Sequence, residues 1–233
     1  MMKIAIMQPY IFPYIGYFQL INAVDKFIIY DDVNYINKGW INRNRILVNG
    51  KDSLFTIPLK EASQNKLINE IEVNWDNSWK SKFLKTIEQS YKKAPFYSEI
   101  LPIIEKTISI NQTTISAVIT LNLKLVNEYL DINTEIVSSS SIYNNTHLKA
   151  QDRIIDICLQ EKAETYINPI GGLELYDKSV FKNQDMALFF IKSKACTYKQ
   201  FKNEFVPWLS IIDVLMFCSK TEVKEYLNNF ELV

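Results

Sequence analysis

The sequence is poor in the residues that build the most familiar catalytic and metal sites. It has one histidine, His147, and three cysteines, Cys158, Cys196 and Cys218, whose spacing fits neither a zinc site nor a disulfide framework. With one imidazole, neither a histidine-based metal centre nor a Ser-His-Asp triad is expected. We interpret the cysteines as small hydrophobic residues in a reducing compartment. We expect His147 to be a solvated loop residue.

The chain also lacks an excess charge and a long apolar run. Lys plus Arg and Asp plus Glu number 26 each, so no overall field attracts DNA or an anionic membrane, and no DNA partner is expected. No uninterrupted apolar stretch approaches about 18 residues, so no membrane insertion is expected. Gln8 and Pro9 interrupt the first apolar run, which argues against a signal peptide. These absences together predict a cytoplasmic protein.

The N-terminal third has the pattern of an α/β unit. Lys3–Gln8 is expected to be a buried strand that Pro9 ends, and Tyr14–Val24 has the apolar spacing of an amphipathic helix. Lys26–Tyr30 follows as a second buried strand. A strand, a helix and a strand within roughly thirty residues predict a βαβ unit with parallel strands and a right-handed crossover.

The rest of the chain predicts one unit built around this sheet. Asn49-Gly50 between two β-rich runs indicates a hairpin, because both turn residues need positive φ. Further strands are expected over Leu67–Val73, Thr134–Val137, Glu164–Asn168 and Ala187–Ile191, and helices over Trp79–Tyr91, Pro95–Ile108, Thr113–Leu130, Ala150–Lys162, Leu209–Cys218 and Glu222–Phe230. The fold class is therefore α/β: a parallel, Rossmann-like core over about 1–75 and 132–233, with a β-hairpin and a largely helical cap over about 76–131.

Residues that suit a ligand follow the first strand. Ligands of α/β sheets bind beyond the carboxyl ends of the strands, and a helix N-terminus offers free N–H groups to a phosphate. Gly16 costs about 1 kcal/mol relative to alanine inside a helix. Either a ligand lying against the backbone or close helix–sheet packing explains it. The candidate binding residues are Gln8, Pro9, Tyr10, Tyr14, Gly16 and Tyr17.

A second group of candidates follows the second strand. Asp31 and Asp32 can accept protons or hold Mg²⁺, and together with Tyr10 they are the candidate catalytic residues. Arg43 can clamp a carboxylate or a phosphate in a bidentate manner. The alternative is that acid and base pair at a surface turn. The candidate binding residues of this group are Trp40, Asn42, Arg43 and Asn44.

Two further segments are candidates for binding. Lys149 and Arg153 are spaced by four, so they can share a helix face and bind a phosphate, while the serines at 138–141 are interpreted as helix caps. Another strand end carries polar and aromatic residues beside two glycines, although an ordinary turn also explains the glycines. The candidates there are Tyr166, Asn168, Gly171, Gly172 and Tyr176.

The apolar segment near the C-terminus is interpreted as core rather than as a site. It contains one acidic residue, Asp213, between isoleucine and valine. An unpaired charge is costly to bury, so Asp213 is expected to have hydrogen-bond partners if it is buried.

The motifs resemble two known families. Tyr14-Ile-Gly16-Tyr17 falls where nucleotidyltransferase-like folds carry His-x-Gly-His, with tyrosine at both histidine positions. Over nearly the whole chain, the order of motifs resembles the WbqC-like family: Gln-Pro-Tyr-x-Phe-Pro-x-x-Gly-Tyr-Phe-x-Leu-Ile, Asp-Asp-Val-Asn-Tyr, Trp-x-Asn-Arg-Asn and Leu-Ser-Ile-Ile-Asp-Val-Leu-Met. That family is associated with bacterial surface-polysaccharide gene clusters.

The resemblance implies a transferase of O-antigen or lipopolysaccharide biosynthesis. Some members are described as glycine transferases, so the expected partners are a nucleotide-linked amino sugar and an amino-acid donor. In this hypothesis the first loop holds the donor, Asp31 or Asp32 binds the amine or acts as base, and Arg43 steadies a phosphate or carboxylate. The donor is either free glycine activated with ATP and Mg²⁺ or an aminoacyl-tRNA; the missing histidines weaken the case for adenylation and leave a preactivated donor open.

Two other functions are compatible with the same residues. One is a nucleotidyltransferase that uses ATP or another NTP on a small substrate without forming an amide. The other is a non-catalytic partner protein that binds a sugar nucleotide. Exposed aromatic residues are also compatible with a homodimer interface.

Overall fold

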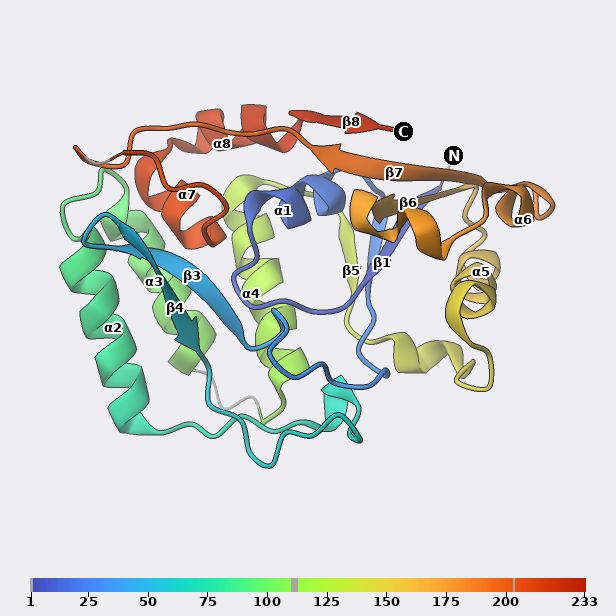
Figure 1. The fold of residues 1–233 in the computed structure, drawn as a ribbon, viewed down its shortest axis with the longest axis horizontal. Helices are drawn as coiled ribbons and strands as arrows, with labels where there is room; N and C mark the ends of the chain where they lie inside the picture. Colours follow the sequence, from blue (N-terminus) through green and yellow to red (C-terminus); the bar gives the residue numbers. More distant parts are fainter. Residues whose placement is uncertain (1, 110–112, 203) are drawn as a thin grey trace.

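A six-stranded, mostly parallel sheet forms the centre of the protein (Figure 1). The computed structural model describes residues 2–109, 113–202 and 204–233. The strand order is β5-β2-β1-β6-β7-β8, and only the edge strand β8 runs antiparallel to its neighbour. The strands are β1 (Lys3–Met7), β2 (Lys26–Ile29), β5 (Glu135–Val137), β6 (Thr165–Pro169), β7 (Ala187–Ser193) and β8 (Phe230–Leu232). The predicted α/β fold class is confirmed.

Both faces of the sheet are buried, because side chains alternate between two hydrophobic clusters. Ala5 and Phe27 point into the larger cluster, whereas Ile4, Ile6 and Ile28 point into the smaller one. Helix α5 lies on the side of the smaller cluster, while α1 and α4 lie on the opposite side (Figure 1). The helices are α1 (Ile15–Asn22), α2 (Asn77–Tyr91), α3 (Tyr97–Ser109), α4 (Ile115–Leu130), α5 (Ala150–Gln160), α6 (Lys178–Lys182), α7 (Ile211–Phe217) and α8 (Lys220–Leu227).

The predicted hairpin forms a separate two-stranded sheet. Strands β3 (Arg43–Val48) and β4 (Lys51–Thr56) pair in an antiparallel register around Asn49 and Gly50, and both turn residues have positive φ as expected. The hairpin lies beside α2 (Figure 1), and β3 also contacts α7. Its apolar residues and those of α2, α3 and α4 belong to the same large cluster as α1 and the central sheet. None of the described helices is long and apolar enough to cross a membrane.

Some predicted elements were wrong. The segment Leu67–Val73 is not a strand: it contains a short 3-10 helix, η1 (Ile68–Glu70), and isolated bridges. Its apolar residues Ile68, Ile71 and Val73 are buried in the larger hydrophobic cluster. The turn predicted after β6 is a 3-10 helix, η3 (Ile170–Leu175), and the last predicted helix ends at Leu227 because the chain then pairs with β7 as β8.

Buried polar residues outside the sheet hold the hairpin to the C-terminal helices. Asp213 is fully buried and has the partners that its burial requires. It accepts hydrogen bonds from the hydroxyls of Tyr91 (2.9 Å) and Tyr198 (2.7 Å) and from the amide of Gln200 (2.6 Å). The Tyr91 hydroxyl also accepts from the backbone N–H of Leu47 at 2.7 Å. Burial raises the pKa of the Asp213 carboxyl.

We expect Tyr91→Phe to lower the free energy of unfolding by about 2–4 kcal/mol, because it leaves the buried Leu47 N–H unpaired and removes one donor from Asp213. Urea denaturation measures this loss. Tyr97→Phe is the matched control, since Tyr97 is half-buried and its hydroxyl has no hydrogen-bond partner among the described residues. A loss below about 0.5 kcal/mol in Tyr91→Phe, the range of an ordinary surface substitution, would contradict this role.

Candidate functional site

A cleft opens at the carboxyl ends of β1 and β6, where the order of the strands in the sheet changes direction. Strand β1 lies between β2 and β6, so the chain turns to one side after β1 and returns later on the other. Ligands of open α/β sheets bind at such a switch point. The cavity here has a volume of about 370 Å³. We call it the switch-point cleft; the residues that line it include Gln8, Tyr10, Tyr30, Asn168, Gly171, Gly172 and Tyr176.

The polar groups of the switch-point cleft are neutral. Burial raises the pKa of Tyr10, Tyr30 and Tyr176, so all three phenols keep their protons near neutral pH. The side chains of Gln8 and Tyr10 form no hydrogen bond with any residue that the structure describes. Amides and phenols can both donate and accept, so the cleft suits the hydroxyls and ring nitrogens of a nucleoside or sugar.

The loop after β1 is held in place by two buried asparagines. The Asn44 amide donates to the carbonyls of Ile11 (3.1 Å) and Phe12 (2.9 Å), and the Asn122 side chain accepts from the Phe12 N–H at 2.9 Å. Phe12 has a φ of 40°, a conformation that costs a non-glycine residue energy and needs such fixation. Asn44 was predicted to bind a ligand; its amide instead positions the loop that carries Tyr10.

Gly16 has a packing role within the loop. A Cβ at this position would lie 2.3 Å from a ring carbon of Tyr14, so the Tyr14 ring occupies the space beside the glycine. Tyr17 is buried, and its hydroxyl donates to the Gln8 carbonyl at 2.8 Å. Of the two tyrosines in the His-x-Gly-His positions, Tyr17 therefore orients Gln8. Pro9 is buried beside it, whereas Tyr14 is half-buried.

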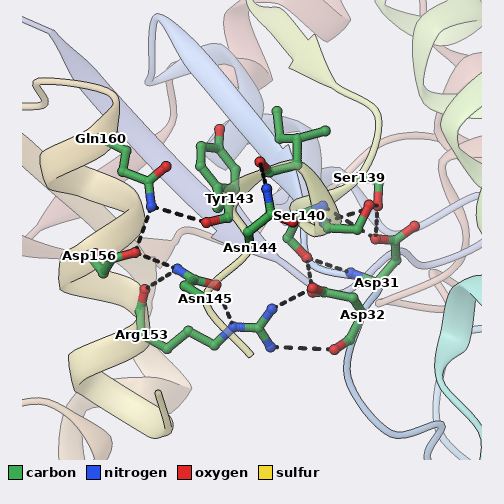
Figure 2. Close-up of polar contacts among 12 residues, drawn as sticks. Asp31, Asp32, Ser139, Ser140, Tyr143, Asn144, Asn145, Arg153, Asp156 and Gln160 are labelled. Carbon is green, nitrogen blue, oxygen red and sulfur yellow. Dashed lines mark hydrogen bonds and ion pairs between the residues drawn. The ribbon is translucent and has the colours of Figure 1, made fainter. Parts of the chain in front are cut away.

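Asp32 forms a buried ion pair with Arg153 of α5 (Figure 2). Asp32 and Arg153 are each 5% exposed. The guanidinium also donates to the Asp32 carbonyl (3.3 Å) and to Asn145 (2.9 Å), and it lies over the Tyr30 ring at 4.9 Å. The Ser140 hydroxyl donates to the other Asp32 oxygen. Arg153, a predicted phosphate ligand, is thus bound to Asp32.

Asp31 points the other way, toward α4. Its carboxylate is 2% exposed and accepts from the hydroxyls of Ser116 (2.5 Å) and Ser139 (2.6 Å) and from the Ser140 N–H (3.3 Å). Burial raises the pKa of Asp31, while the serine hydrogen bonds oppose the shift. Asp31 lines a second cavity of about 380 Å³, which we call the Asp31 cavity.

The adjacent aspartates thus have different surroundings. Tyr30 and Asp32 both contact Arg153 of α5, whereas Asp31 contacts Ser116 of α4. The side chains of Tyr30, Asp31 and Asp32 thus point alternately to opposite faces, as successive side chains of a strand do. Among the described residues, no cluster of three or more histidine, cysteine, aspartate or glutamate side chains could hold a metal ion.

The hairpin candidates lie apart from Asp31 and Asp32. Trp40 is partly exposed and lies 5.8 Å from the Arg43 guanidinium, which donates to the carbonyls of Gly39 (2.9 Å) and Lys38. Asn42 is buried; its side chain accepts from Tyr35 at 2.9 Å and donates to the Ile57 carbonyl at 2.8 Å. Trp40 and Tyr10 share a further cavity with Tyr14 and Trp208.

The predicted residues after β6 do meet those after β1. Asn168 accepts from the Tyr166 hydroxyl at 3.0 Å, and a Cβ at Gly172 would lie 1.9 Å from the Asn168 amide nitrogen. Gly172 thus lets η3 approach Asn168 closely, while Tyr166 is fully buried behind the cleft. Lys149 is exposed and precedes α5, and His147 is an exposed loop residue, as expected.

Sequence reasoning did not identify Ser116, Lys124 or Asn145. Ser116 and Lys124 lie on α4, which looked like a core helix, and no local pattern connects them with residues 85 or more positions away. The run of serines at 138–141 was visible but was interpreted as caps. Ser139 does cap the 3-10 helix η2 (Ser140–Tyr143), and the same serine also binds Asp31.

We expect Arg153→Met to lower the free energy of unfolding by about 3–5 kcal/mol, because Asp32 would keep a buried charge without its cation. The double variant Asp32→Asn, Arg153→Met removes both charges and should recover part of this loss. Lys60→Met, which breaks the exposed pair with Glu72, is the control and should cost at most about 1 kcal/mol. Equal losses in Arg153→Met and Lys60→Met during urea denaturation would show that the buried pair has no special role.

Comparisons with known proteins agree with the family that the order of motifs indicates. The model of the WbqC-like protein family matches residues 8–225. Protein Rv1507c of Mycobacterium tuberculosis, described as uncharacterized, is 31% identical over 232 residues, which cover 97% of this chain and 98% of that protein. No solved structure matches. The matched region contains the loop after β1, both aspartates and Asn168, and we conclude that the chain belongs to the WbqC-like protein family.

Proposed function

We propose that the protein is a transferase of surface-polysaccharide biosynthesis that attaches a glycyl group to the amine of a nucleotide-linked amino sugar. The observation that carries the proposal is the pair of cavities at one edge of the sheet. The switch-point cleft has neutral hydrogen-bonding groups, and the Asp31 cavity has a buried carboxylate. Tyr30 lines the first cavity and the next residue, Asp31, lines the second. The two cavities have no described lining residue in common, so each can take one of two substrates.

The switch-point cleft is the proposed donor site. An aminoacyl adenylate and the 3′ end of an aminoacyl-tRNA both present an adenosine, whose ring nitrogens and ribose hydroxyls need neutral donors and acceptors. Gln8, Tyr10 and Asn168 supply such groups at the switch point. The described residues that line the cleft include neither lysine nor arginine, which favours a donor activated before it binds. Of the two donors that the sequence leaves open, this lining therefore favours the preactivated one.

The reaction itself needs a free amine and a base. The amine lone pair attacks the glycyl carbonyl carbon, a C–N bond forms, and the C–O bond to the donor breaks. AMP leaves from an adenylate; from an ester the tRNA 3′-oxygen leaves and takes up a proton from solvent, which regenerates the hydroxyl. The proton lost by the amine goes to Asp31, whose raised pKa makes its carboxylate a better base than an exposed aspartate. ATP and Mg²⁺ are then required only to make the donor.

A non-catalytic sugar-nucleotide-binding protein is the second candidate. Asp32 is paired with Arg153, and Asp31 already accepts three hydrogen bonds. Carboxylates held in this way can be purely structural. In this alternative both cavities bind their ligands and no bond is made.

The first test is incubation of the purified protein with a nucleotide-linked amino sugar and either glycine, ATP and Mg²⁺ or glycyl-tRNA, followed by mass spectrometry. We expect the sugar nucleotide to gain the mass of one glycyl group with glycyl-tRNA. Pyrophosphate release from ATP without this gain would indicate nucleotidyl transfer instead. Binding without any product from either donor would support the non-catalytic alternative.

The second test replaces the proposed base. We expect Asp31→Asn to lower kcat more than tenfold, a barrier increase above about 1.4 kcal/mol, because asparagine cannot accept the proton. Circular dichroism and thermal unfolding of the same preparation establish that the variant is folded. A loss of less than tenfold in a folded Asp31→Asn protein would exclude Asp31 as the base.

The third test concerns the donor site. Tyr10→Phe removes a hydroxyl that has no partner among the described residues, so the thermal unfolding midpoint should stay unchanged. We expect the KM for the donor to rise about 2- to 12-fold, the effect of one neutral hydrogen bond. The KM for the acceptor should not change. An unchanged donor KM would remove Tyr10 from the proposed donor site.

A further inference from the structure

Asp31 is a buried carboxylate without a cation. In the part of the chain that the structure describes, no lysine, arginine or histidine forms an ion pair with it, although it is 2% exposed. Its neighbour Asp32 has Arg153. Buried charges in proteins are normally paired, so the missing cation at Asp31 requires an explanation. Asp213 is likewise buried with no cation among the described residues, and it too accepts three hydrogen bonds; Asp31 differs because it lines a cavity that a ligand can enter.

The Asp31 carboxylate can accept one more hydrogen bond than the structure gives it. A carboxylate offers about four lone-pair positions. Ser139 and the Ser140 N–H bond one oxygen, and Ser116 alone bonds the other. The Ser116 oxygen, after donating its proton, still has lone pairs for a ligand. An ammonium group, which has three donors and no acceptor, would fit the carboxylate oxygen and this hydroxyl together.

The wall of the Asp31 cavity is rich in hydroxyls. Four parts of the chain form it: the end of β2, the segment after β5, η1 and the first turns of α4. Its polar residues include Asn69, Thr114, Ser116, Thr120, Ser138 and Ser139. The Thr120 hydroxyl is buried and has no hydrogen-bond partner among the described residues. A polyhydroxylated ligand matches such a wall better than an apolar one, because each ligand hydroxyl finds a partner.

Lys124 supplies a positive charge to the same cavity. It lies on α4 two turns after Ser116 and is exposed. Its ammonium group donates to the Ser138 hydroxyl at 3.2 Å and forms no ion pair with any described residue. Ser138 precedes Ser139, which binds Asp31. The cavity therefore combines a carboxylate that lacks a cation with a lysine that lacks an anion.

We propose that the Asp31 cavity binds an amino sugar that carries a phosphate: Asp31 and Ser116 hold its ammonium group, the hydroxyl wall holds the ring, and Lys124 holds the phosphate. The volume of about 380 Å³ falls within the range of small-molecule pockets. This assignment rests on the proposed function in one respect, since it identifies the amine-bearing sugar with the acceptor. Binding itself requires no transfer reaction.

Isothermal titration of the full chain with four sugars tests the assignment. Glucosamine 1-phosphate carries the ammonium and the phosphate, N-acetylglucosamine 1-phosphate lacks the charge on nitrogen, glucose 1-phosphate lacks the nitrogen, and glucosamine lacks the phosphate. We expect glucosamine 1-phosphate to bind at least about tenfold more tightly than each of the others, because the bonds to Asp31 and Lys124 are charge-assisted. Equal affinity for glucosamine 1-phosphate and glucose 1-phosphate, or no binding of glucosamine 1-phosphate, overturns the proposal.

Variants assign each half of the ligand to its residue. Asp31→Asn should abolish the preference for the ammonium and keep the preference for phosphate. Lys124→Met should do the reverse, and Lys124→Arg should restore phosphate binding. Lys85→Met, on the exposed face of α2, is the matched control and should bind like the original protein. If Lys124→Met and Lys85→Met bind glucosamine 1-phosphate equally well, Lys124 does not hold the phosphate and the proposal fails. Because Lys124 is exposed, its variants stay informative if Asp31→Asn does not fold.

The result separates this inference from the proposed function. Ammonium-dependent binding that Asp31→Asn abolishes, without any glycylated product, supports the amino-sugar site and contradicts the transferase. Glycylated product with an unchanged acceptor KM in both Asp31→Asn and Lys124→Met supports the transferase and overturns the amino-sugar site.

Discussion

Two consecutive buried carboxylates constrain the whole carboxyl edge of the sheet. Asp31 and Asp32 follow β2, and nearly every donor that they require comes from a distant part of the chain. Ser116 comes from α4, Ser139 and Ser140 come from the segment after β5, and Arg153 comes from α5. Burying these charges is favourable only when all of these elements are in place. The acid pair therefore ties the helices of both faces to one strand end.

The polar groups beside the two aspartates also differ between the two faces of the sheet. On the α5 side, Asp32 is neutralised by Arg153, and the adjoining switch-point cleft contains phenols and amides. On the α4 side, Asp31 has serine donors, and neither Asp31 nor the nearby Lys124 forms an ion pair with a residue that the structure describes. Two adjacent aspartates thus acquire different partners from their surroundings. The proposed division into a donor site and an acceptor site follows from this difference.

Local patterns were sufficient for most of the architecture. The βαβ unit at the N-terminus, the Asn49-Gly50 hairpin and the fold class depend on short-range periodicity and on turn residues with positive φ, and the structure confirms them. The strand predicted over Leu67–Val73 was wrong because an irregular segment can also alternate polar and apolar residues; this one buries Ile68, Ile71 and Val73. Strand β8 was missed because a three-residue edge strand is defined by its neighbour β7 rather than by its own sequence.

The sequence alone placed the candidate binding residues at the strand ends, because carboxyl ends of parallel strands converge whatever the side chains do. It also placed Gln8, Tyr10 and Asn168 at that edge, where the structure brings them into one cleft. Only the tertiary structure decided which polar residues stay free. Asn44, Tyr17 and Arg153 looked like ligands, yet buried backbone carbonyls and a buried aspartate take up their hydrogen bonds. The reason is physical: a buried polar group must be paired, and its partner can lie far away in the chain, as Asp32 lies 121 positions from Arg153.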